Sequence, residues 1–272
     1  MKYLAIGHVC EDLTPKGPVL GGSVAYAALT ARYLGWNAKI ITCANKFFSS
    51  LYGKEMNGVK MECRRCQKTT SFKNVHNGNQ RKLFLNAKAD QIKLYFPKDF
   101  FGVDLVHLAP VIDELRVQMI FYMPETCFVG VTPQGWLREV GSDGAILPKK
   151  WEERDMERVL KRADAVVLSI DDVCGDWNLL DSWAGQTKIL AVTQGASGAT
   201  VYFDGKKTPC AGVRVDNVID PTGAGDVFAA AFFISLQEGK GPITAARLAG
   251  IVASQSIQYE NVSFFQNQGE KK

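Results

Sequence analysis

The segment that decides the fold is Asp220-Pro221-Thr222-Gly223-Ala224-Gly225-Asp226-Val227-Phe228, which leads into the apolar run AAAFFISL. The run has the character of a buried helix, and Thr222 is expected to cap it. The glycines allow the backbone to approach a ligand closely. The amides of residues 223–226 would then lie at a helix N-terminus, where they and the helix dipole favour a phosphate. The segment therefore predicts an anion-binding turn.

Asp226 is the unusual residue of this turn. A carboxylate beside a bound phosphate is unfavourable unless it exchanges a proton there. Phosphoryl transfer to a hydroxyl needs such a general base next to groups that hold the phosphate. The structural alternative is a glycine-rich left-handed turn in which Asp226 only interacts with the helix dipole. Spacing alone leaves both interpretations open.

Outward from this turn, short apolar runs alternate with helix-like stretches along the chain. The runs predict buried strands, and the helix-like stretches carry apolar residues three and four positions apart. This alternation predicts a parallel sheet covered by helices. The predicted strands are 3–7, 38–43, 103–108, 127–131, 165–169 and 189–193, and the predicted helices are 22–34, 152–162, 224–237 and 243–258.

Two stretches predict hairpins. Residues 69–86 contain two strand-like runs around Asn77-Gly78, which is typical of a tight hairpin turn. Their polar content favours a flap or lid at the edge of the sheet, with an ordinary surface hairpin as the alternative. Asp204-Gly205 predicts a second hairpin, which we interpret as structural.

Composition excludes several classes of protein. The chain has 272 residues, of which 46% are hydrophobic and 22% charged, so disordered and collagen-like proteins are excluded. No apolar run is long enough for a membrane helix, and the N-terminus lacks the pattern of a signal peptide. The net charge of +4 is spread along the chain, without the basic stripe of a nucleic-acid-binding protein. We expect a single cytoplasmic domain over residues 1–272.

The chain has seven cysteines, which are expected to be free thiols in a protein without a secretion signal. Cys63 and Cys66 form a C-x-x-C pair, the pattern of a redox centre or of half a zinc site. The sequence has no second C-x-x-C and no H-x3-H to complete a tetrahedral site. The role of this pair stays open.

The long motif at 220–228 resembles the C-terminal signature of the ribokinase family of small-molecule kinases, also called the PfkB carbohydrate kinases. Two further elements are similar to motifs of that family, namely the di-glycine Gly21-Gly22 before a helix and the turn Thr193-Gln194-Gly195-Ala196-Ser197-Gly198. Together they cover nearly the whole chain in the family's order. The resemblance implies a ribokinase-like three-layer α/β/α sandwich with a mostly parallel central sheet and a β-hairpin lid.

The resemblance also implies roles for individual residues. Asp226 matches the catalytic base, and Gly223, Ala224 and Gly225 match the anion hole. Thr193, Gly195 and Gly198 match nucleotide-binding positions, and Asp12, at the end of the first strand, matches a substrate-binding carboxylate. Asp220 matches a residue that helps to bind a monovalent cation. Asp172 stands where relatives carry an acidic residue linked to Mg²⁺, with an exposed carboxylate at a helix start as the alternative.

Departures from the general family pattern narrow the substrate. Tyr26 stands where many sugar kinases have Asn, and Cys10 where a ribokinase has Asn. Only eight residues separate Asp12 from Gly21, so we expect the 69–86 hairpin to be all that remains of the lid. These features resemble the myo-inositol kinase branch. The implied substrate-binding residues are Asp12, Gly21, Gly22, Tyr26, Gln134 and Arg138, with a structural salt bridge as the alternative for Arg138. Asn74, on the 69–86 hairpin, is a further candidate that could reach a polyol, with a solvated surface position as the alternative.

The sequence therefore predicts an ATP-dependent kinase that phosphorylates a hydroxyl of a polyol or sugar, with myo-inositol favoured. The resemblance implies ATP and Mg²⁺ as cofactors, and K⁺ as a further one. The expected partners are the small-molecule substrate, the nucleotide and a second copy of the chain in a homodimer, without nucleic acid or membrane. The alternatives are a kinase for another sugar or a nucleoside, and a metabolite-binding homologue without catalysis. An oxidoreductase is disfavoured because G-x-G-x-x-G does not follow the first strand.

Overall fold

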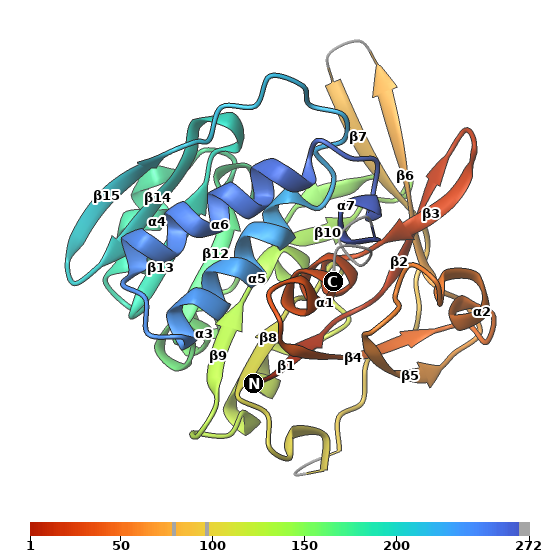
Figure 1. The fold of residues 1–272 in the computed structure, drawn as a ribbon, viewed down its shortest axis with the longest axis horizontal. Coiled ribbons are helices and arrows are strands. Elements are labelled where there is room, and N and C mark those ends of the chain that lie inside the picture. The colour runs from red at the N-terminus through yellow and green to blue at the C-terminus, as the bar shows by residue number, and fades with distance from the viewer. Residues whose placement is uncertain (78–79, 96–97, 267–272) are drawn as a thin grey trace.

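A computed structural model describes residues 1–77, 80–95 and 98–266 of the chain. In this described part, a nine-stranded sheet runs through the molecule in the order β15-β14-β13-β12-β9-β8-β1-β4-β5 (Figure 1). All six predicted strands belong to it. Its members are β1 (Lys2–Ile6), β4 (Asn37–Ala44), β5 (Lys60–Arg65), β8 (Leu105–Leu108), β9 (Phe128–Val131), β12 (Ala165–Ser169), β13 (Ile189–Thr193), β14 (Gly198–Phe203) and β15 (Lys206–Ala211).

Seven consecutive strands of this sheet, from β13 to β5, pair in parallel, and β14 and β15 add an antiparallel edge. β14 and β15 are the predicted second hairpin. Asp204 and Gly205 join them with φ values of 53° and 68°. Positive φ at both central residues is typical of a type I′ turn, whose backbone twist matches the twist of the two strands that it joins.

Helices cover both faces of the sheet, which confirms the three-layer prediction. Successive strand residues point to opposite faces, so Ala5 joins one apolar core and Ile6 the other. The first core packs against α1 (Ser23–Tyr33), α5 (Ala224–Gln237), α6 (Pro242–Ser256) and α7 (Ser263–Gln266). The second packs against α3 (Glu153–Arg162), α4 (Trp177–Ala184) and the 3-10 turns η1 (Lys98–Phe100) and η2 (Val117–Tyr122). The short helix α2 (Phe48–Tyr52) lies between β4 and β5.

A separate four-stranded sheet forms the lid, with the order β3-β2-β6-β7. Its strands are β2 (Cys10–Thr14), β3 (Gly17–Gly21), β6 (Thr70–Asn77) and β7 (Gln80–Ala87). In Figure 1 it projects from the side of the main sheet that carries β4 and β5. A small apolar cluster around Phe72, Val111 and Ile112 holds it to the rest of the molecule. A two-stranded ribbon, β10 (Arg138–Val140) and β11 (Ile146–Pro148), lies beside it.

The predicted 69–86 hairpin is confirmed as β6 and β7, although the turn residues Gly78 and Asn79 lie outside the described part of the chain. The expectation that this hairpin is the whole lid was wrong. The short segment between Asp12 and Gly21 itself forms an antiparallel pair, with only Pro15 and Lys16 between the two strands. A hairpin needs as few as two turn residues.

No helix in the described residues is long and apolar enough to cross a membrane.

Candidate active site

A cavity of about 940 Å³ lies between the lid and the carboxyl ends of the parallel strands. Parallel α/β sheets gather their ligands at this edge. Twelve of the predicted site residues line the cavity, and they come from both the lid and the main sheet. They are Asp12, Gly22, Tyr26, Asn74, Gln134, Arg138, Asp172, Thr193, Gly223, Ala224, Gly225 and Asp226. Four predicted residues are not part of the lining, namely Gly21, Gly195, Gly198 and Asp220.

Gly223 begins the α5 helix in a conformation that only glycine adopts easily. Its φ is 76°, in the left-handed region, and it takes the N-cap position in place of Thr222. The predicted cap at Thr222 was therefore wrong. A side chain at Gly223 would also meet the ring of Tyr26, because an added Cβ would lie 2.4 Å from Tyr26 Cδ1. Gly223 thus lets the turn and the Tyr26 ring pack directly together.

The first turn of α5 offers backbone amides to the cavity. The Ala224 amide donates to the Pro221 carbonyl at 3.2 Å, which closes the turn. The next two amides, of Gly225 and Asp226, belong to the first helical turn and have no acceptor within the helix. Because Gly225 and Asp226 line the cavity, these amides are suited to hold an anion there.

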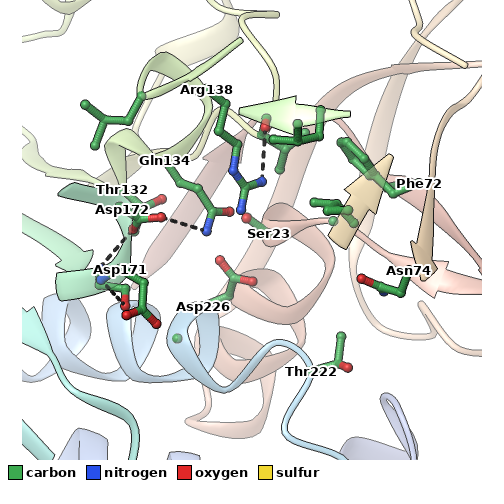
Figure 2. A pocket seen from close by; sticks show the side chains of 18 of the residues that line it. Ser23, Phe72, Asn74, Thr132, Gln134, Arg138, Asp171, Asp172, Thr222 and Asp226 are labelled. Carbon is green, nitrogen blue, oxygen red and sulfur yellow. Dashed lines mark hydrogen bonds between the residues drawn. The ribbon is translucent and has the colours of Figure 1, made fainter. Parts of the chain in front are cut away.

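Asp226 lies in the same turn, partly exposed to the cavity (Figure 2). Burial raises the pKa of its carboxyl to about 6, and the charges of Asp172 and Asp12 act in the same direction. A hydrogen bond from the Ser23 hydroxyl and the charge of Arg138 oppose that rise. A carboxylate with this pKa is ionised at neutral pH but more basic than an ordinary Asp, which suits a general base.

Asp172 lies across the cavity from Asp226 in Figure 2, in the 3-10 turn η4 (Ile170–Val173). Its Oδ2 accepts the Ser169 amide at 2.9 Å, and its Oδ1 accepts from Gln134 Nε2 at 3.3 Å. Burial raises the pKa of Asp172, against the lowering effects of these bonds and of Arg138. Asp172 therefore lies at a helix start, but it is partly buried and faces the cavity, unlike the exposed carboxylate of the alternative interpretation. Its predicted role in binding Mg²⁺ stays a prediction.

Gln134 and Arg138 come from the segment that follows β9. Gln134 belongs to the 3-10 turn η3 (Pro133–Trp136), and Arg138 begins β10. Arg138 Nη1 donates to the Val111 carbonyl at 3.4 Å, and its side chain points into the cavity in Figure 2. Its positive charge lowers the pKa of both Asp172 and Asp226. Arg138 therefore compensates part of the negative charge buried here.

The lid contributes Asp12 from β2 and Asn74 from β6. Asp12 was expected at the end of the first strand, but it lies within the lid strand β2. Gly21 lies on the neighbouring strand β3, and a Cβ added to Gly21 would lie 2.4 Å from Asp12 Oδ2. The predicted substrate contact of Gly21 is therefore corrected, because this glycine makes room for the Asp12 carboxylate.

The di-glycine element leads into α1. Gly22 has a φ of 93°, and an added Cβ would lie 2.6 Å from the His8 carbonyl oxygen, so no other residue fits easily. This sharp entry places Ser23 at the cavity wall, where its hydroxyl bonds to Asp226. Tyr26, one turn later, lines the cavity and donates its hydroxyl to Asn261 Oδ1 at 3.1 Å.

The Thr193–Gly198 turn joins β13 to β14 and only its first residue reaches the cavity. Gly198 is corrected to a structural position, because an added Cβ would lie 2.2 Å from the Cys210 carbonyl oxygen. Gly195 has a φ of 56°, and an added Cβ would have no described heavy atom within 4 Å. The space beside Gly195 is therefore open to solvent or to a ligand.

Asp220 uses both carboxylate oxygens to hold the backbone of the turn. Oδ1 accepts the Thr222 amide and Oδ2 accepts the Asn261 amide, each at 2.9 Å. These bonds fix the approach of the chain to α5. The predicted binding of a monovalent cation by Asp220 stays a prediction.

Several cavity residues escaped the sequence analysis, notably Ser23, Phe72, Lys82 and Thr132. Ser23 directly follows the di-glycine, and this position next to a recognised motif was the available signal. Phe72 and Lys82 lie on lid strands. Alternate residues of a strand point to opposite faces of the sheet, and which residues point into the cavity cannot be decided until the strand register is known.

The sequence profile of the pfkB family carbohydrate kinases matches residues 19–268, and the chain belongs to this family. The nucleoside kinase of Methanocaldococcus jannaschii is 25% identical over 256 residues, which span 88% of this chain and 80% of that enzyme. The cytidine kinase of Thermococcus kodakarensis is 20% identical over 264 residues, with 88% and 90% covered. These matches support phosphotransferase activity.

The fold is also similar to solved structures. One is a pyrophosphate-dependent kinase of the ribokinase family, in complex with a pyrophosphate analogue and myo-inositol. It superposes with a TM-score of 0.80 at 24% identity, covering 97% of this chain and 99% of that one. The ribokinase-like fold expected from the sequence is thereby confirmed.

Proposed function

We propose that this protein transfers the γ-phosphoryl group of ATP to a hydroxyl of a small polyol, with myo-inositol as the first candidate. The observation that carries the proposal is Asp226, whose carboxyl has a pKa of about 6 and stands beside the N-terminal amides of α5. A proton acceptor and an anion site then share one cavity with the polar side chains that can hold a polyol.

In the proposed reaction, Asp226 accepts the proton of the attacking hydroxyl. The hydroxyl oxygen forms a bond to the γ-phosphorus while the bond from that phosphorus to the oxygen of the leaving ADP breaks. The Gly225 and Asp226 amides hold the transferring group, and Arg138 neutralises part of its charge. Ser23 fixes the Asp226 carboxylate through its hydroxyl.

The cavity is suited to hold Mg²⁺ near Asp172. Carboxylate oxygens are the ligands that Mg²⁺ prefers, and it usually takes one or two of them together with water and substrate phosphates. The raised pKa of Asp172 reflects a buried negative charge that a cation would offset. Mg²⁺, when bound, supplies further neutralisation of the phosphate oxygens. We keep K⁺ as a proposed activator of the Asp220 turn.

Polar groups on two opposite sides of the cavity support a polyol as acceptor. Asp12 and Asn74 face it from the lid, while Gln134 and Arg138 face it from the opposite wall. Carboxylate, amide and guanidinium groups together accept from and donate to hydroxyls all around a small ring. The myo-inositol in a solved relative of the same fold agrees with this choice.

A nucleoside is the second candidate acceptor, and the aromatic rings of the cavity favour it. Phe72 comes from the lid and Tyr26 from α1, and both line the space that the acceptor would occupy. Aromatic rings can stack on a nucleobase. Two relatives are a nucleoside kinase and a cytidine kinase, which also supports this alternative.

The donor is tested together with the acceptor. The experiment is a turnover screen in which ATP and pyrophosphate are each offered with myo-inositol, ribose, fructose, adenosine and cytidine, in the presence of Mg²⁺. Pyrophosphate is included because a relative of the same fold depends on it. Turnover of myo-inositol with ATP, lost in Asp226→Asn, is the expected result. Turnover of a nucleoside alone would overturn the polyol, and turnover with pyrophosphate alone would overturn ATP.

A protein that binds metabolites without catalysis would give a different pattern. It would bind myo-inositol in a calorimetric titration and turn over no acceptor with either donor. That outcome would refute the kinase mechanism, and a retained rate in Asp226→Asn would refute the assignment of the base.

A further inference from the structure

Two cysteines and an aspartate meet outside the active-site cavity. The Sγ atoms of Cys43 and Cys66 and a carboxylate oxygen of Asp90 all lie within 4.8 Å of one another. Cys43 is on β4, Cys66 directly follows β5, and Asp90 follows the lid strand β7. None of the three lines the cavity described above. The cluster therefore lies where the lid joins the main sheet.

The C-x-x-C pattern of the sequence does not itself form this cluster. Cys63 is on β5 and packs against the core that contains α1, whereas Cys66 packs against the core on the other face of the sheet. Cys43, on the neighbouring strand, belongs to that second core. The residue that pairs with Cys66 is thus Cys43, and Cys63 provides a natural control.

Cys66 and Asp90 are held in place by their backbones. The Cys66 amide donates to the Ala44 carbonyl at 3.1 Å. The Asp90 carbonyl oxygen is 2.9 Å from His8 Nε2, so this nitrogen must carry the proton, because a carbonyl can only accept. His8 Nδ1 then accepts from the Thr70 hydroxyl at 2.7 Å.

Thr70 completes the chain of bonds, since its Oγ1 also accepts the Ala89 amide at 3.0 Å. His8 and Thr70 are buried, and their bonds fix the segment that carries Asp90 although the Asp90 side chain is exposed. The ligand groups are therefore largely pre-positioned.

The charges in this cluster favour a cation. Within the part of the chain that the structure describes, no ion pair joins a basic side chain to Asp90. Three groups that can carry negative charge thus lie within 4.8 Å of one another, and a divalent cation would offset the charge of Asp90 and of thiolates formed beside it.

We propose that Cys43, Cys66 and Asp90 bind one zinc-class ion, with water as the fourth ligand. Two sulfurs and a carboxylate oxygen are a donor set typical of zinc. Tetrahedral Zn–S bonds of about 2.3 Å place two sulfurs about 3.8 Å apart, so the ligands need to move by no more than about 1 Å. Binding releases one proton from each thiol.

Such an ion joins three segments that meet at the base of the lid. Cys66 precedes β6 and Asp90 follows β7, so both ends of the lid hairpin are tied to β4 through one centre. The site is distinct from the phosphoryl-transfer site and does not depend on the proposed reaction. Its expected effect is to reduce local opening of the lid at its base.

The test uses the full chain, reduced and freed of metal by a chelator, and titrated with Co²⁺ and then Zn²⁺. Excess Mg²⁺ is present to saturate the carboxylates of the active site, because Mg²⁺ competes poorly for sulfur ligands. We expect one equivalent of Co²⁺ to bind with sulfur-to-cobalt charge-transfer absorption, and one equivalent of Zn²⁺ to displace it. Calorimetry in buffers of different ionisation enthalpy should show the release of about two protons.

Matched variants decide the assignment. Cys66→Ser and Asp90→Asn are expected to lose the charge-transfer bands or weaken binding at least about tenfold, whereas Cys63→Ser and Cys174→Ser should bind as the native protein does. Hydrogen exchange gives a second measure, since Zn²⁺ should slow exchange at the Cys66 and Ala89 amides. The proposal is refuted if no stoichiometric binding occurs, if Cys63→Ser loses it, or if Cys43 and Cys66 form only a disulfide.

Discussion

Replacing Asp226 by Asn should remove most of the activity and make the protein more stable. The activity should fall about 10²- to 10⁴-fold, the usual contribution of a general base, while the substrate KM changes little because the side chains have the same shape. In the native protein, the acid limb of the kcat/KM profile, which reports the free enzyme, should follow the Asp226 pKa of about 6. The value of kcat/KM should therefore fall about tenfold between about pH 7 and about pH 5.

The gain in stability follows from the same pKa. The folded state holds the Asp226 proton up to about pH 6, but the unfolded chain releases it near the ordinary Asp pKa of 3.8. As pH rises between these values, the unfolded state binds fewer protons than the folded state, so the native protein loses stability. The loss is complete above the folded pKa and amounts to about 3 kcal/mol, against about 1.5 kcal/mol at about pH 5.

Asn cannot ionise, so Asp226→Asn should recover most of that loss. Urea unfolding of both proteins at about pH 5 and about pH 7.5 measures this recovery. The unfolding free energy of the variant should exceed that of the native protein by an amount that grows with pH. Asp176→Asn is the matched control, because Asp176 caps α4 through the Leu179 amide at 3.0 Å and Asn caps equally well. Equal stability of Asp226→Asn and the native protein at both pH values would refute the burial of this charge, and an unchanged kcat would refute its role.

Further substitutions test the surroundings of the base. Ser23→Ala should move the acid limb to higher pH, because the Ser23 hydroxyl lowers the Asp226 pKa, and the pH profile of kcat/KM measures this. Gly21→Ala should raise the KM of the acceptor at least severalfold in steady-state assays, because the new Cβ would lie 2.4 Å from Asp12 Oδ2. Gly223→Ala should cost about 1–2 kcal/mol of unfolding free energy from its φ of 76° alone, with a further cost from the Tyr26 ring. A homodimer through residues 69–86 predicts a dimeric mass by light scattering, and a fully active monomer would contradict it.

The main sheet could be predicted because its strands are covered on both faces. Such strands appear as short apolar runs, and each residue of β8 from Leu105 to Leu108 is indeed buried. The lid strands β2 and β3 lack this signal, because most of their residues are partly buried or exposed and Pro15-Lys16 is not a typical hairpin turn. The lid sheet also depends on the pairing of β2 with β6, which is a contact between residues distant in sequence.

The candidate site was predictable to the extent that it is encoded in local motifs. The α5 turn carries its own glycines and its own carboxylate, so the segment alone indicated Asp226 as a candidate base, although its spacing left the role of this residue open. Its cap could not, because the choice between Thr222 and Gly223 depends on the Tyr26 ring packed against the turn. The Ser23 bond likewise joins α1 to α5 and becomes apparent only when the two helices pack together.

Because the charged form of Asp226 costs stability, binding of the phosphate donor is expected to depend on the ionisation of this base. Burial contributes most of the rise in the Asp226 pKa, and Asp172 and Asp12 add to it, so the cavity has an excess of buried negative charge. Arg138 offsets only part of it, since the net effect is still a pKa of about 6. A phosphate donor alone would add to this excess, whereas Mg²⁺ bound with the donor near Asp172 would offset the Asp172 charge that raises the Asp226 pKa, and so lower that pKa. Binding of ATP with Mg²⁺ should therefore stabilise the fold more at about pH 8 than at about pH 5, and ATP with EDTA should not. Thermal unfolding with and without Mg²⁺ at both pH values measures this difference, and stabilisation by ATP that is independent of Mg²⁺ would contradict it.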